Sequence, residues 1–288
     1  MKKLTLISMA LIAAGMVYTG NNSADAQKLS FGLNVGAGIP MGAFAKHDSS
    51  ALPVSQYTSN NAGKVNDTTK FNGFAKTGFH FNVWGQYMIA GPIGVKLQIG
   101  GSMISYDVTS LNSDIATEYA AYSGSHSSAG SPTFTAKNYY VGQYLIGPSL
   151  RLPAGKFNIE GQILVGLVST TYPTLTENLD QSSTSGGITY SETGSSILSF
   201  KSSSGFGYNI SAGIEDKIAP HIGLHLDVGY TGSSLSVASY TSTTSGTETV
   251  TIAGFTSSQA FNSTNTDNNS KTLSVSLLQI TLGLSVDL

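Results

Sequence analysis

Apolar and polar residues alternate one by one along much of the chain, most clearly between residues 79 and 103. In 79–83 the apolar Phe, Phe and Val alternate with His and Asn, and in 95–99 Val, Leu and Ile alternate with Lys and Gln. A period of two is that of a β-strand with one apolar and one polar face. The pattern leaves open which face meets water, because the apolar side can line a soluble core or face lipid.

Eight segments share this alternation, and most of them have roughly 10–14 residues, which exceeds the usual strand of five or six. Their ranges are 29–39, 76–88, 93–106, 138–151, 157–170, 204–215, 221–231 and 272–288. A tilted membrane-spanning strand needs about 9–11 residues. The segments therefore have the length of such strands with a short overhang.

The connections between these segments alternate between short and long. The short ones are 89–94, 152–156 and 216–220, and the long ones are 40–75, 107–137, 171–203 and 232–271. An antiparallel meander sends every second connection to the same end, and outer-membrane barrels have short periplasmic turns and long extracellular loops. We therefore predict an all-β fold, a closed antiparallel up-and-down transmembrane β-barrel of eight strands. Both termini are expected in the periplasm.

This fold assigns the apolar face to lipid, since only closure satisfies every backbone group there. We expect these residues to point outward: Phe79, Phe81, Val83, Tyr87, Val95, Leu97 and Ile99. We expect these to point inward: His80, Asn82, Gln86, Lys96 and Gln98. A soluble lipocalin-like barrel would reverse the faces and need a charged exterior, but the charged fraction is 10%, against about 25% in soluble domains.

The first residues have the pattern of a secretory signal peptide. A basic start, MKK, precedes an apolar run that ends near Val17, and Ala24-Asp25-Ala26 is a small-x-small cleavage sequence before Gln27. A transmembrane anchor is the alternative, but the run is short of the ~20 residues that a helix needs. We expect 1–26 to be removed and 27–288 to form one barrel domain.

Composition excludes several classes of function. There are no cysteines, so disulfides and thiolate metal sites are impossible. With 14 basic and 16 acidic residues the net charge is −2, and this gives no electrostatic footprint for nucleic acid. We expect no cofactor.

The terminal segment LLQITLGLSVDL, residues 277–288, is similar to the last strand that barrel-insertion machinery reads. With the strand number, the loop alternation and the leader, it makes 27–288 resemble the small eight-stranded OmpA/OmpX-type barrels of Gram-negative outer membranes. Members commonly end in Phe, whereas this chain ends in Leu288. The resemblance implies outer-membrane lipid, lipopolysaccharide and the insertion machinery as partners. The peptidoglycan-binding domain of longer OmpA-like proteins is not carried over, because the chain stops with this strand.

Charged residues on the inward face form the best-defined constellation. They are Lys96, Arg151, Glu160, Glu215 and Asp227, with His80 and His225 beside them. Opposite charges in a narrow lumen should pair, since an isolated buried charge is costly. We predict a salt-bridge plug near the periplasmic end, and a gate or ion path is the alternative.

Bulky residues also fall on the inward face. Strict alternation puts Trp84, Leu145 and Leu164 inside, opposite inward glycines, although a β-bulge would turn Trp84 outward. An aromatic girdle is expected at the outer surface. Its candidates are Phe79, Tyr87, Tyr140, Tyr144, Phe157, Phe206, Tyr208 and Tyr230.

The candidates for chemistry are weak. Outer-membrane lipid A deacylases use a His-x-Ser pair, and the segments His47-Asp48-Ser49 and His126-Ser127-Ser128 lie in Ser-rich loops where such pairs arise by chance. His221 and His225 share a strand face but lack an evident third metal ligand. Residues 267–269, Asp-Asn-Asn, offer oxygen ligands for calcium as an alternative to a plain loop. We predict no catalytic and no metal site.

The long connections carry the expected function. Residues 233–255 are predicted as a hairpin that turns at Thr244-Ser245-Gly246, with a flexible Ser/Thr-rich loop as the alternative. We predict a structural or surface-interaction role, of the adhesion type, through an unidentified extracellular partner. A small-solute channel is the second hypothesis and a lipid-modifying hydrolase the third.

Overall fold

The computed structural model describes residues 29–47, 73–123, 128–129, 133–237, 240–268 and 271–288. The predicted signal peptide, 1–26, lies outside these ranges. Eight long strands form the closed barrel: β1 (Leu29–Pro40), β2 (Ala75–Ala90), β3 (Ile93–Tyr106), β6 (Tyr139–Ala154), β7 (Phe157–Thr171), β10 (Ser203–Ala219), β11 (Ile222–Val237) and β14 (Lys271–Asp287). Each pairs antiparallel with its chain neighbours within this set, and β1 closes on β14.

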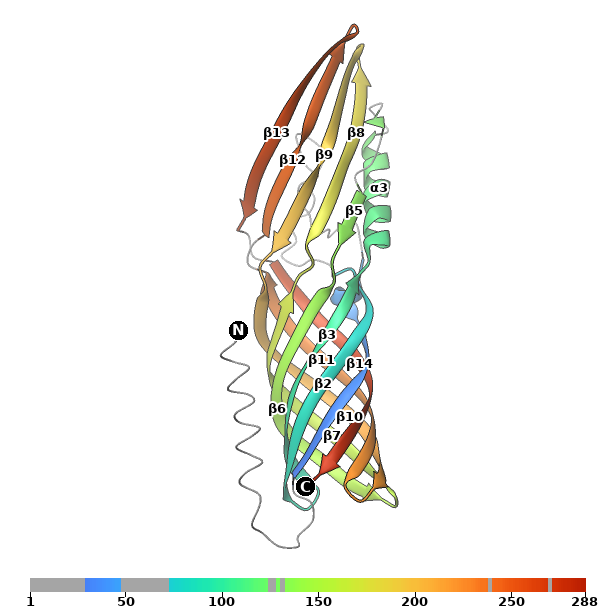
Figure 1. Ribbon diagram of the computed structural model, residues 1–288, viewed down its shortest axis with the longest axis vertical. Helices are drawn as coiled ribbons and strands as arrows, with labels where there is room; N and C mark the ends of the chain where they lie inside the picture. Colours follow the sequence, from blue (N-terminus) through green and yellow to red (C-terminus); the bar gives the residue numbers. More distant parts are fainter. Residues whose placement is uncertain (1–28, 48–72, 124–127, 130–132, 238–239, 269–270) are drawn as a thin grey trace.

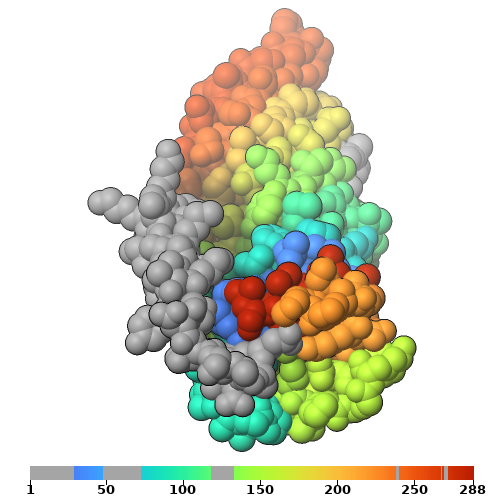
Figure 2. All heavy atoms as spheres, turned by 60° about the horizontal axis from the view of Figure 1, so that its bottom comes forward, coloured from blue at the N-terminus to red at the C-terminus, as the bar shows by residue number. Residues whose placement is uncertain are grey.

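The predicted fold class is confirmed, because these strands match the eight predicted segments to within a few residues. The barrel is an up-and-down meander with three short turns at one end and the chain's long connections at the other (Figure 1). In Figure 2 the short-turn end faces forward, and the turns lie around the last residues of β14. No helix in the described part of the chain is long and apolar enough to cross a membrane.

The outer surface of the barrel is apolar, as period two requires for a lipid-facing wall. Leu33, Phe81, Ile163, Ile210 and Leu282 are each about half exposed, at 46–56%. All seven residues predicted to face outward are exposed except Ile99, which is partly buried, and all five predicted to face inward are buried. The parity of β2 and β3 is thus as predicted.

A second sheet stands beyond the long-connection end of the barrel (Figure 1). It consists of β4 (Ser128–Ala129), β5 (Thr133–Ala136), β8 (Leu175–Ser185), β9 (Ile188–Phe200), β12 (Tyr240–Ile252) and β13 (Phe255–Asp267). We call it the external sheet. Its order is β13-β12-β9-β8-β4, with β5 also paired to β8. The helix α3 (Val108–Ser123) lies beside β5 of this sheet, whereas the short helix α2 (Gly42–Ala45) contacts the barrel strands β14 and β2.

The long connections therefore differ from the prediction. The hairpin near 233–255 exists, but it spans β12 and β13 and turns at Ala253-Gly254, so the expected turn at 244–246 is wrong. A matching hairpin, β8–β9, and helix α3 were not predicted. In both hairpins polar Ser and Thr occupy both faces of the strands, so no apolar–polar alternation marks them.

Both hairpins end in two-residue turns with left-handed backbone. Gly186 and Gly187 have φ of 59° and 79°, and Ala253 and Gly254 have 49° and 85°. Two consecutive positive φ values define the type I′ turn, whose twist matches that of paired strands. The turns thus set the register of the two hairpins, which both continue without a register shift.

Candidate functional site

The barrel interior at the short-turn end holds a cluster of ion pairs centred on Arg151 of β6. Its guanidinium lies 2.7 Å from Glu160, 3.5 Å from Glu215 and 3.2 Å from Asp287. These carboxylates come from β7, β10 and β14, so one side chain connects three strands across the lumen. The carboxylate of Asp287 also accepts a hydrogen bond from Ser30 (2.6 Å) and pairs with Lys217 (2.9 Å).

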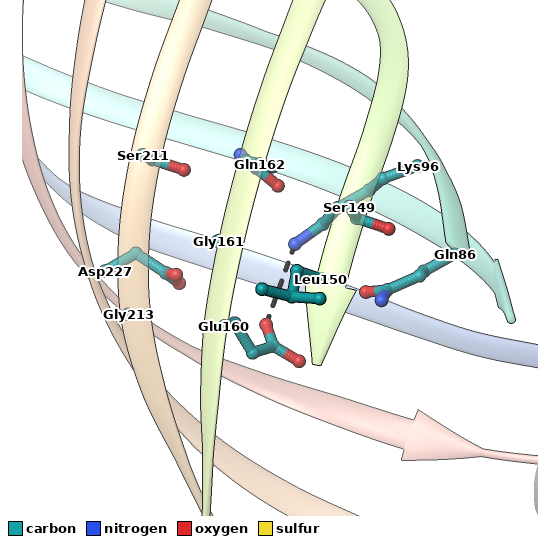
Figure 3. Close-up of a pocket in the computed structure, with 10 residues that line it drawn as sticks. All are labelled: Gln86, Lys96, Ser149, Leu150, Glu160, Gly161, Gln162, Ser211, Gly213 and Asp227. Atoms are coloured by element: carbon teal, nitrogen blue, oxygen red, sulfur yellow. Dashed lines mark ion pairs between the residues drawn. The ribbon is translucent and has the colours of Figure 1, made fainter. Parts of the chain in front are cut away.

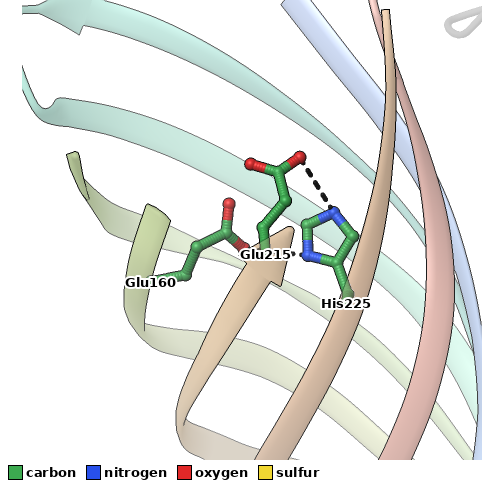
Figure 4. Close-up of side chains that lie close together, drawn as sticks. All are labelled: Glu160, Glu215 and His225. Carbon is green, nitrogen blue, oxygen red and sulfur yellow. Dashed lines mark ion pairs between the residues drawn. The ribbon is translucent and has the colours of Figure 1, made fainter. Parts of the chain in front are cut away.

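His225 and Lys96 complete this ion-pair cluster. The imidazole of His225 lies between two carboxylates, with Nδ1 3.4 Å from Glu160 and Nε2 3.3 Å from Glu215 (Figure 4). The Lys96 ammonium lies 3.9 Å from Glu160 and 4.0 Å above the centre of the Trp84 ring. The three partners of the histidine and lysine, Glu160, Glu215 and Trp84, are at most 6% exposed. Charges buried this deeply need the mutual compensation that the geometry provides.

The interior beside this cluster is filled. In Figure 3, Lys96 reaches across the lumen toward Glu160, and Gln86, Gln162 and Asp227 point into the same space from other strands. The space between these side chains is too small for a water molecule. No β-bulge turns Trp84 outward, since the pairing of β2 with β3 shifts only near 76–79 and 88–90. The Trp84 ring lies inside the barrel against Gly32, where a Cβ would collide with the indole.

A hydrogen-bonded polar layer lies above the ion-pair cluster. Asn209 donates to Thr231 (2.9 Å) and to Gln279 (3.2 Å), and Thr231 donates to Gln143 (3.2 Å). Gln162 donates to Asn209 (3.3 Å). The layer joins side chains of five barrel strands, and it fills the middle of the lumen with hydrogen-bonding polar groups.

An apolar core closes the other end of the barrel and continues into the base of the external sheet. Its members are almost fully buried and come from the barrel, both helices and the external strands. Tyr139 is central: its ring lies 5.1 Å from Phe44 of α2 and 5.8 Å from Tyr106, and its hydroxyl donates to the carbonyl of Gly73 (2.6 Å). Leu164 (0% exposed) contributes from β7. This apolar closure was not predicted.

The residues predicted to form the ion-pair cluster do not all lie together in the structure. Lys96, Arg151, Glu160, Glu215 and His225 lie together at the short-turn end. Asp227 lies inside the barrel but accepts a hydrogen bond from Asn34 (3.2 Å) rather than pairing with a cation within 4.0 Å. His80 is not beside the ion-pair cluster, because its Nδ1 lies 2.7 Å from Ser102, toward the opposite end.

Sequence reasoning missed Asp287 and Lys217. Asp287 continues the inward series Gln279, Thr281, Gly283 and Ser285 of β14, so alternation within that strand would have identified it. Lys217 keeps the parity of Glu215, and the register irregularity of β10 comes after it, between Lys217 and Ala219. It was missed because the sequence pattern predicts a turn at 216–220.

Glu160, Glu215 and His225 also form, within the described residues, a group that could hold a metal. One ligand atom from each lies within 4.8 Å of the others. The geometry favours ion pairing instead, because His225 turns a different nitrogen to each carboxylate, and Arg151 and Lys96 already neutralise Glu160. A divalent cation would have to enter beside two fixed positive charges.

The remaining candidates are only partly described. Residues 48–49 and 126–127 of the two His-Ser segments, and Asn269 of the calcium candidate, lie outside the described residues. Seven of the eight girdle candidates have exposed side chains, from 37% for Phe157 to 71% for Phe206, and Tyr230 is partly buried. Phe79, Tyr140, Phe206 and Tyr208 lie toward the long-connection end, Tyr87 and Phe157 at the short turns, and Tyr144 and Tyr230 nearer the middle of their strands.

The external sheet contains a row of polar residues that face one another across four strands. Gln181, Glu192, Glu248 and Gln259 pair in register along it. A hollow of about 180 Å³ lies over the first three of these residues. Burial, with the charge of Glu248, raises the pKa of Glu192. Burial, with the charge of Glu192, raises the pKa of the nearby Glu177 to about 7.

Comparison with known proteins gives structural likeness without sequence likeness. No protein-family model matches the chain, and no curated protein matches its sequence. The attachment invasion locus protein Ail of Yersinia pestis is 10% identical, with a TM-score of 0.38 over 90% of this chain and 99% of that one. Neisserial surface protein A gives 10% and 0.36 over 92% and 100%. A major outer membrane protein of Thermus thermophilus gives 10% and 0.36 over 90% and 99%. Likenesses at this level carry no argument about activity or partners, and the fold rests on the closed strand order itself.

Proposed function

We propose that this protein is an OmpA/OmpX-type barrel of a Gram-negative outer membrane that presents the external sheet to a partner at the cell surface. The observation that carries the proposal is the contrast between the two parts. The barrel interior is filled by ion pairs, amides and an apolar core, while the external sheet extends beyond it with exposed polar faces (Figure 1). The surface available for contact is therefore that of the external sheet.

The distribution of lysines supports an outward-facing sheet in contact with lipopolysaccharide. Each of the four strands that re-enter the barrel from the long connections has a lysine at or within two residues of its start: Lys76, Lys137, Lys201 and Lys271. The strands β8, β9, β12 and β13 contain no Lys or Arg. Lysines above an aromatic girdle suit the phosphate-rich headgroup region of the outer leaflet.

Insertion into the outer membrane is part of the proposal. The exterior of β14 is apolar up to Leu288, which is 57% exposed. A terminal strand of this kind suits recognition by the barrel-insertion machinery. In detergent, the folded barrel should run at a different apparent size on a denaturing gel before and after boiling, and a protein recovered from the soluble periplasm without this shift would contradict the proposal.

Shortening the external sheet tests the contact role. Replacing 245–262 by Asn-Gly, and 180–193 by Asn-Gly, joins the paired residues Thr244 and Ser263 and the paired residues Leu179 and Gly194 by type I′ turns. Leu175, Leu198 and Tyr240, which pack on the barrel, are kept. We expect cells with the shortened protein to lose attachment to surfaces, to host cells and to one another while the heat-dependent gel shift remains. Unchanged attachment would contradict the proposal.

A small-solute channel receives no support from the interior. A solute would have to displace the ion-pair cluster, the amide layer and the apolar core in turn. Conductance is therefore expected to be absent.

A further inference from the structure

The outer edge of β13 is an unpaired strand edge. β13 pairs with β12 along its whole length, from Phe255 opposite Ile252 to Asp267 opposite Tyr240, without a register shift. No other strand of the described chain lies beside it, because β13 is the first strand in the order of the external sheet. From Phe255 to Thr266 every residue is exposed except Phe261, which is partly buried. The edge is therefore open to solvent.

The turn before β13 determines which backbone groups are free. In a two-residue type I′ hairpin the residues that flank the turn, here Ile252 and Phe255, exchange both backbone hydrogen bonds. The odd-numbered residues of β13 consequently bond to β12. The even-numbered residues direct their N–H and C=O groups away from the sheet: Thr256, Ser258, Ala260, Asn262, Thr264 and Thr266.

The edge has none of the features that normally prevent edge-to-edge pairing. Natural edge strands are kept apart by Lys, Pro, bulges or short length. β13 has 13 residues, and from Phe255 to Thr266 it contains no proline and no charged residue. The Phe261 ring lies over Gly246 of β12, where a Cβ would be 2.7 Å from its Cζ, so this large side chain does not extend over the edge.

We propose that the free edge of β13 pairs with the same edge of a second copy of the protein, antiparallel and about a two-fold axis at Phe261. In this register Thr256 faces Thr266, Ser258 faces Thr264 and Ala260 faces Asn262. All six outward-directed residues then form hydrogen-bonded pairs. Like charges do not meet at any of these pairs, and every side chain is small or uncharged.

The symmetry requires the antiparallel arrangement. A two-fold axis parallel to the strands would make a parallel pair in which each residue lies beside its own copy. In a parallel ladder, a residue that directs its N–H and C=O groups to the partner strand lies beside a residue that directs them away, so identical residues cannot lie side by side. A two-fold axis across the strands satisfies the ladder and gives a closed, isologous contact. A second copy is thus a self-complementary occupant of this edge.

The orientation of the external sheet turns this pairing into a contact between membranes. Its strands run along the long axis of the molecule, away from the barrel (Figure 1). A two-fold axis across them points the two barrels in opposite directions, so the copies lie in two facing membranes. Overlap along β13 would hold those membranes roughly 40 Å apart at 3.3–3.4 Å per residue. This inference rests on the proposed surface-contact function and names its partner.

Vesicle tethering tests the pairing. Two populations of proteoliposomes, labelled with different fluorophores and carrying the full-length mature protein, are mixed, and their association is measured by fluorescence cross-correlation. We expect wild-type vesicles to associate, and Ala260→Lys/Asn262→Lys to reduce association to that of protein-free vesicles, because lysines then face lysines. Thr243→Lys/Thr247→Lys is the matched control: it adds the same charge on exposed positions of β12 and should leave association unchanged.

Charge reversal makes the test specific for the register. Vesicles with Ala260→Glu/Asn262→Glu should not associate with one another but should associate with the lysine population. In the cysteine-free chain, oxidation should join Gln259→Cys to Ser263→Cys only when the two populations are mixed. Association of the lysine population with itself, failure of the charge-reversed populations to associate, or cross-linking confined to one membrane would overturn the inference. Persistent attachment of the lysine variant to foreign surfaces would leave the surface-contact function intact, since that function is tested by the shortened sheet.

Discussion

At the scale of single residues, Arg151 decides the balance of charge inside the barrel. Three carboxylates from different strands lie within 3.5 Å of its guanidinium. Their mutual repulsion in a dry interior is offset by this group, with help from Lys96 and His225. Removing one partner of a buried ion pair is more harmful than replacing the whole pair, because the remaining charges stay buried and uncompensated.

We expect Arg151→Met to destabilise the folded barrel by about 3–5 kcal/mol. The measurement is urea unfolding in lipid vesicles followed by the fluorescence of Trp84, the only tryptophan. Lys156→Met is the control: Lys156 pairs with Asp216 at 3.7 Å but its side chain is 72% exposed, so its loss should change stability by less than about 1 kcal/mol. Equal effects of the two substitutions would contradict a structural role for the cluster.

Glu177 gives the external sheet a dependence on pH. Its folded-state pKa, about 7, is raised from 4.5 by burial and by Glu192, and the pKa of Glu192 is raised by burial and Glu248. A raised carboxyl pKa means that the folded state binds the proton more tightly. Stability from this source is therefore complete below pH 4.5 and is lost as pH rises toward 7.

We expect Glu177→Gln to remove this dependence. At pH 8 the amide protection factors of β8 and β9, corrected for intrinsic exchange rates, should exceed those of the wild type by an amount on the order of 2 kcal/mol. At pH 4 the two proteins should agree. A wild-type sheet that is equally protected at pH 4 and pH 8 would refute the argument.

Single positions also show how far the sequence can predict the interior. A period of two assigns each residue to a face, so alternation alone places Lys96, Glu160 and Trp84 inside. It does not say which inward residues meet across the lumen. That depends on strand tilt and stagger, which bring Arg151 next to Asp287 although 136 residues separate them. The partners within the cluster were for this reason beyond the sequence pattern.

At the scale of elements, the lipid-facing and lumen-facing sides of a strand should respond differently to substitution. Leu97 and Ile280 are 39% and 42% exposed on the barrel wall, whereas Gln98 is 3% exposed and accepts a hydrogen bond from Gln162. We expect Leu97→Arg and Ile280→Arg to weaken folding into vesicles by roughly 2–4 kcal/mol near the midplane. Gln98→Leu loses one amide contact and should cost about 1 kcal/mol. If Gln98→Leu proves as harmful as Leu97→Arg, the faces are reversed.

The turn of the β12–β13 hairpin contains a residue in an unfavourable backbone region. Ala253 has φ of 49°, which a residue with a Cβ adopts at a cost of about 1 kcal/mol. We expect Ala253→Gly to raise the protection factors of β12 and β13 by about that amount, and Gly254→Ala, at φ of 85°, to lower them. A lower protection after Ala253→Gly would show that chain flexibility outweighs relief of the strained φ.

The barrel strands were predictable and the external strands were not, for the same physical reason. A wall between lipid and a polar lumen requires an apolar–polar alternation, and this is visible in the sequence of β2 or β14. Both faces of β12 and β13 meet water over most of their length, so selection for an apolar face is absent. Their only local signals are the turn glycines and the density of Ser and Thr, which flexible loops share.

At the scale of the whole molecule, the barrel is a closed support with filled layers along its axis. Eight strands leave an interior just wide enough for side chains. The ion-pair cluster occupies one end, the amide layer the middle and the apolar core the other end, where helix α2 adds Phe44. This construction anchors the external sheet rigidly, because Leu175, Leu198 and Tyr240 at its base belong to the same buried core as the barrel's own residues.

We expect no stable conductance when the protein is reconstituted in planar bilayers. The filled layers determine which substitutions should produce a conductance. Glu160→Ala should destabilise the barrel without opening it, because the apolar core, with Tyr139 buried, still closes the other end. Combining Glu160→Ala with Tyr139→Ala removes material from both ends and should give brief, irregular openings, with the heat-dependent gel shift as the control for folding. Steady openings from Glu160→Ala alone would mean that the ion-pair cluster is the sole gate. Long, uniform openings of the wild type would contradict the closed interior and return the channel hypothesis to first place.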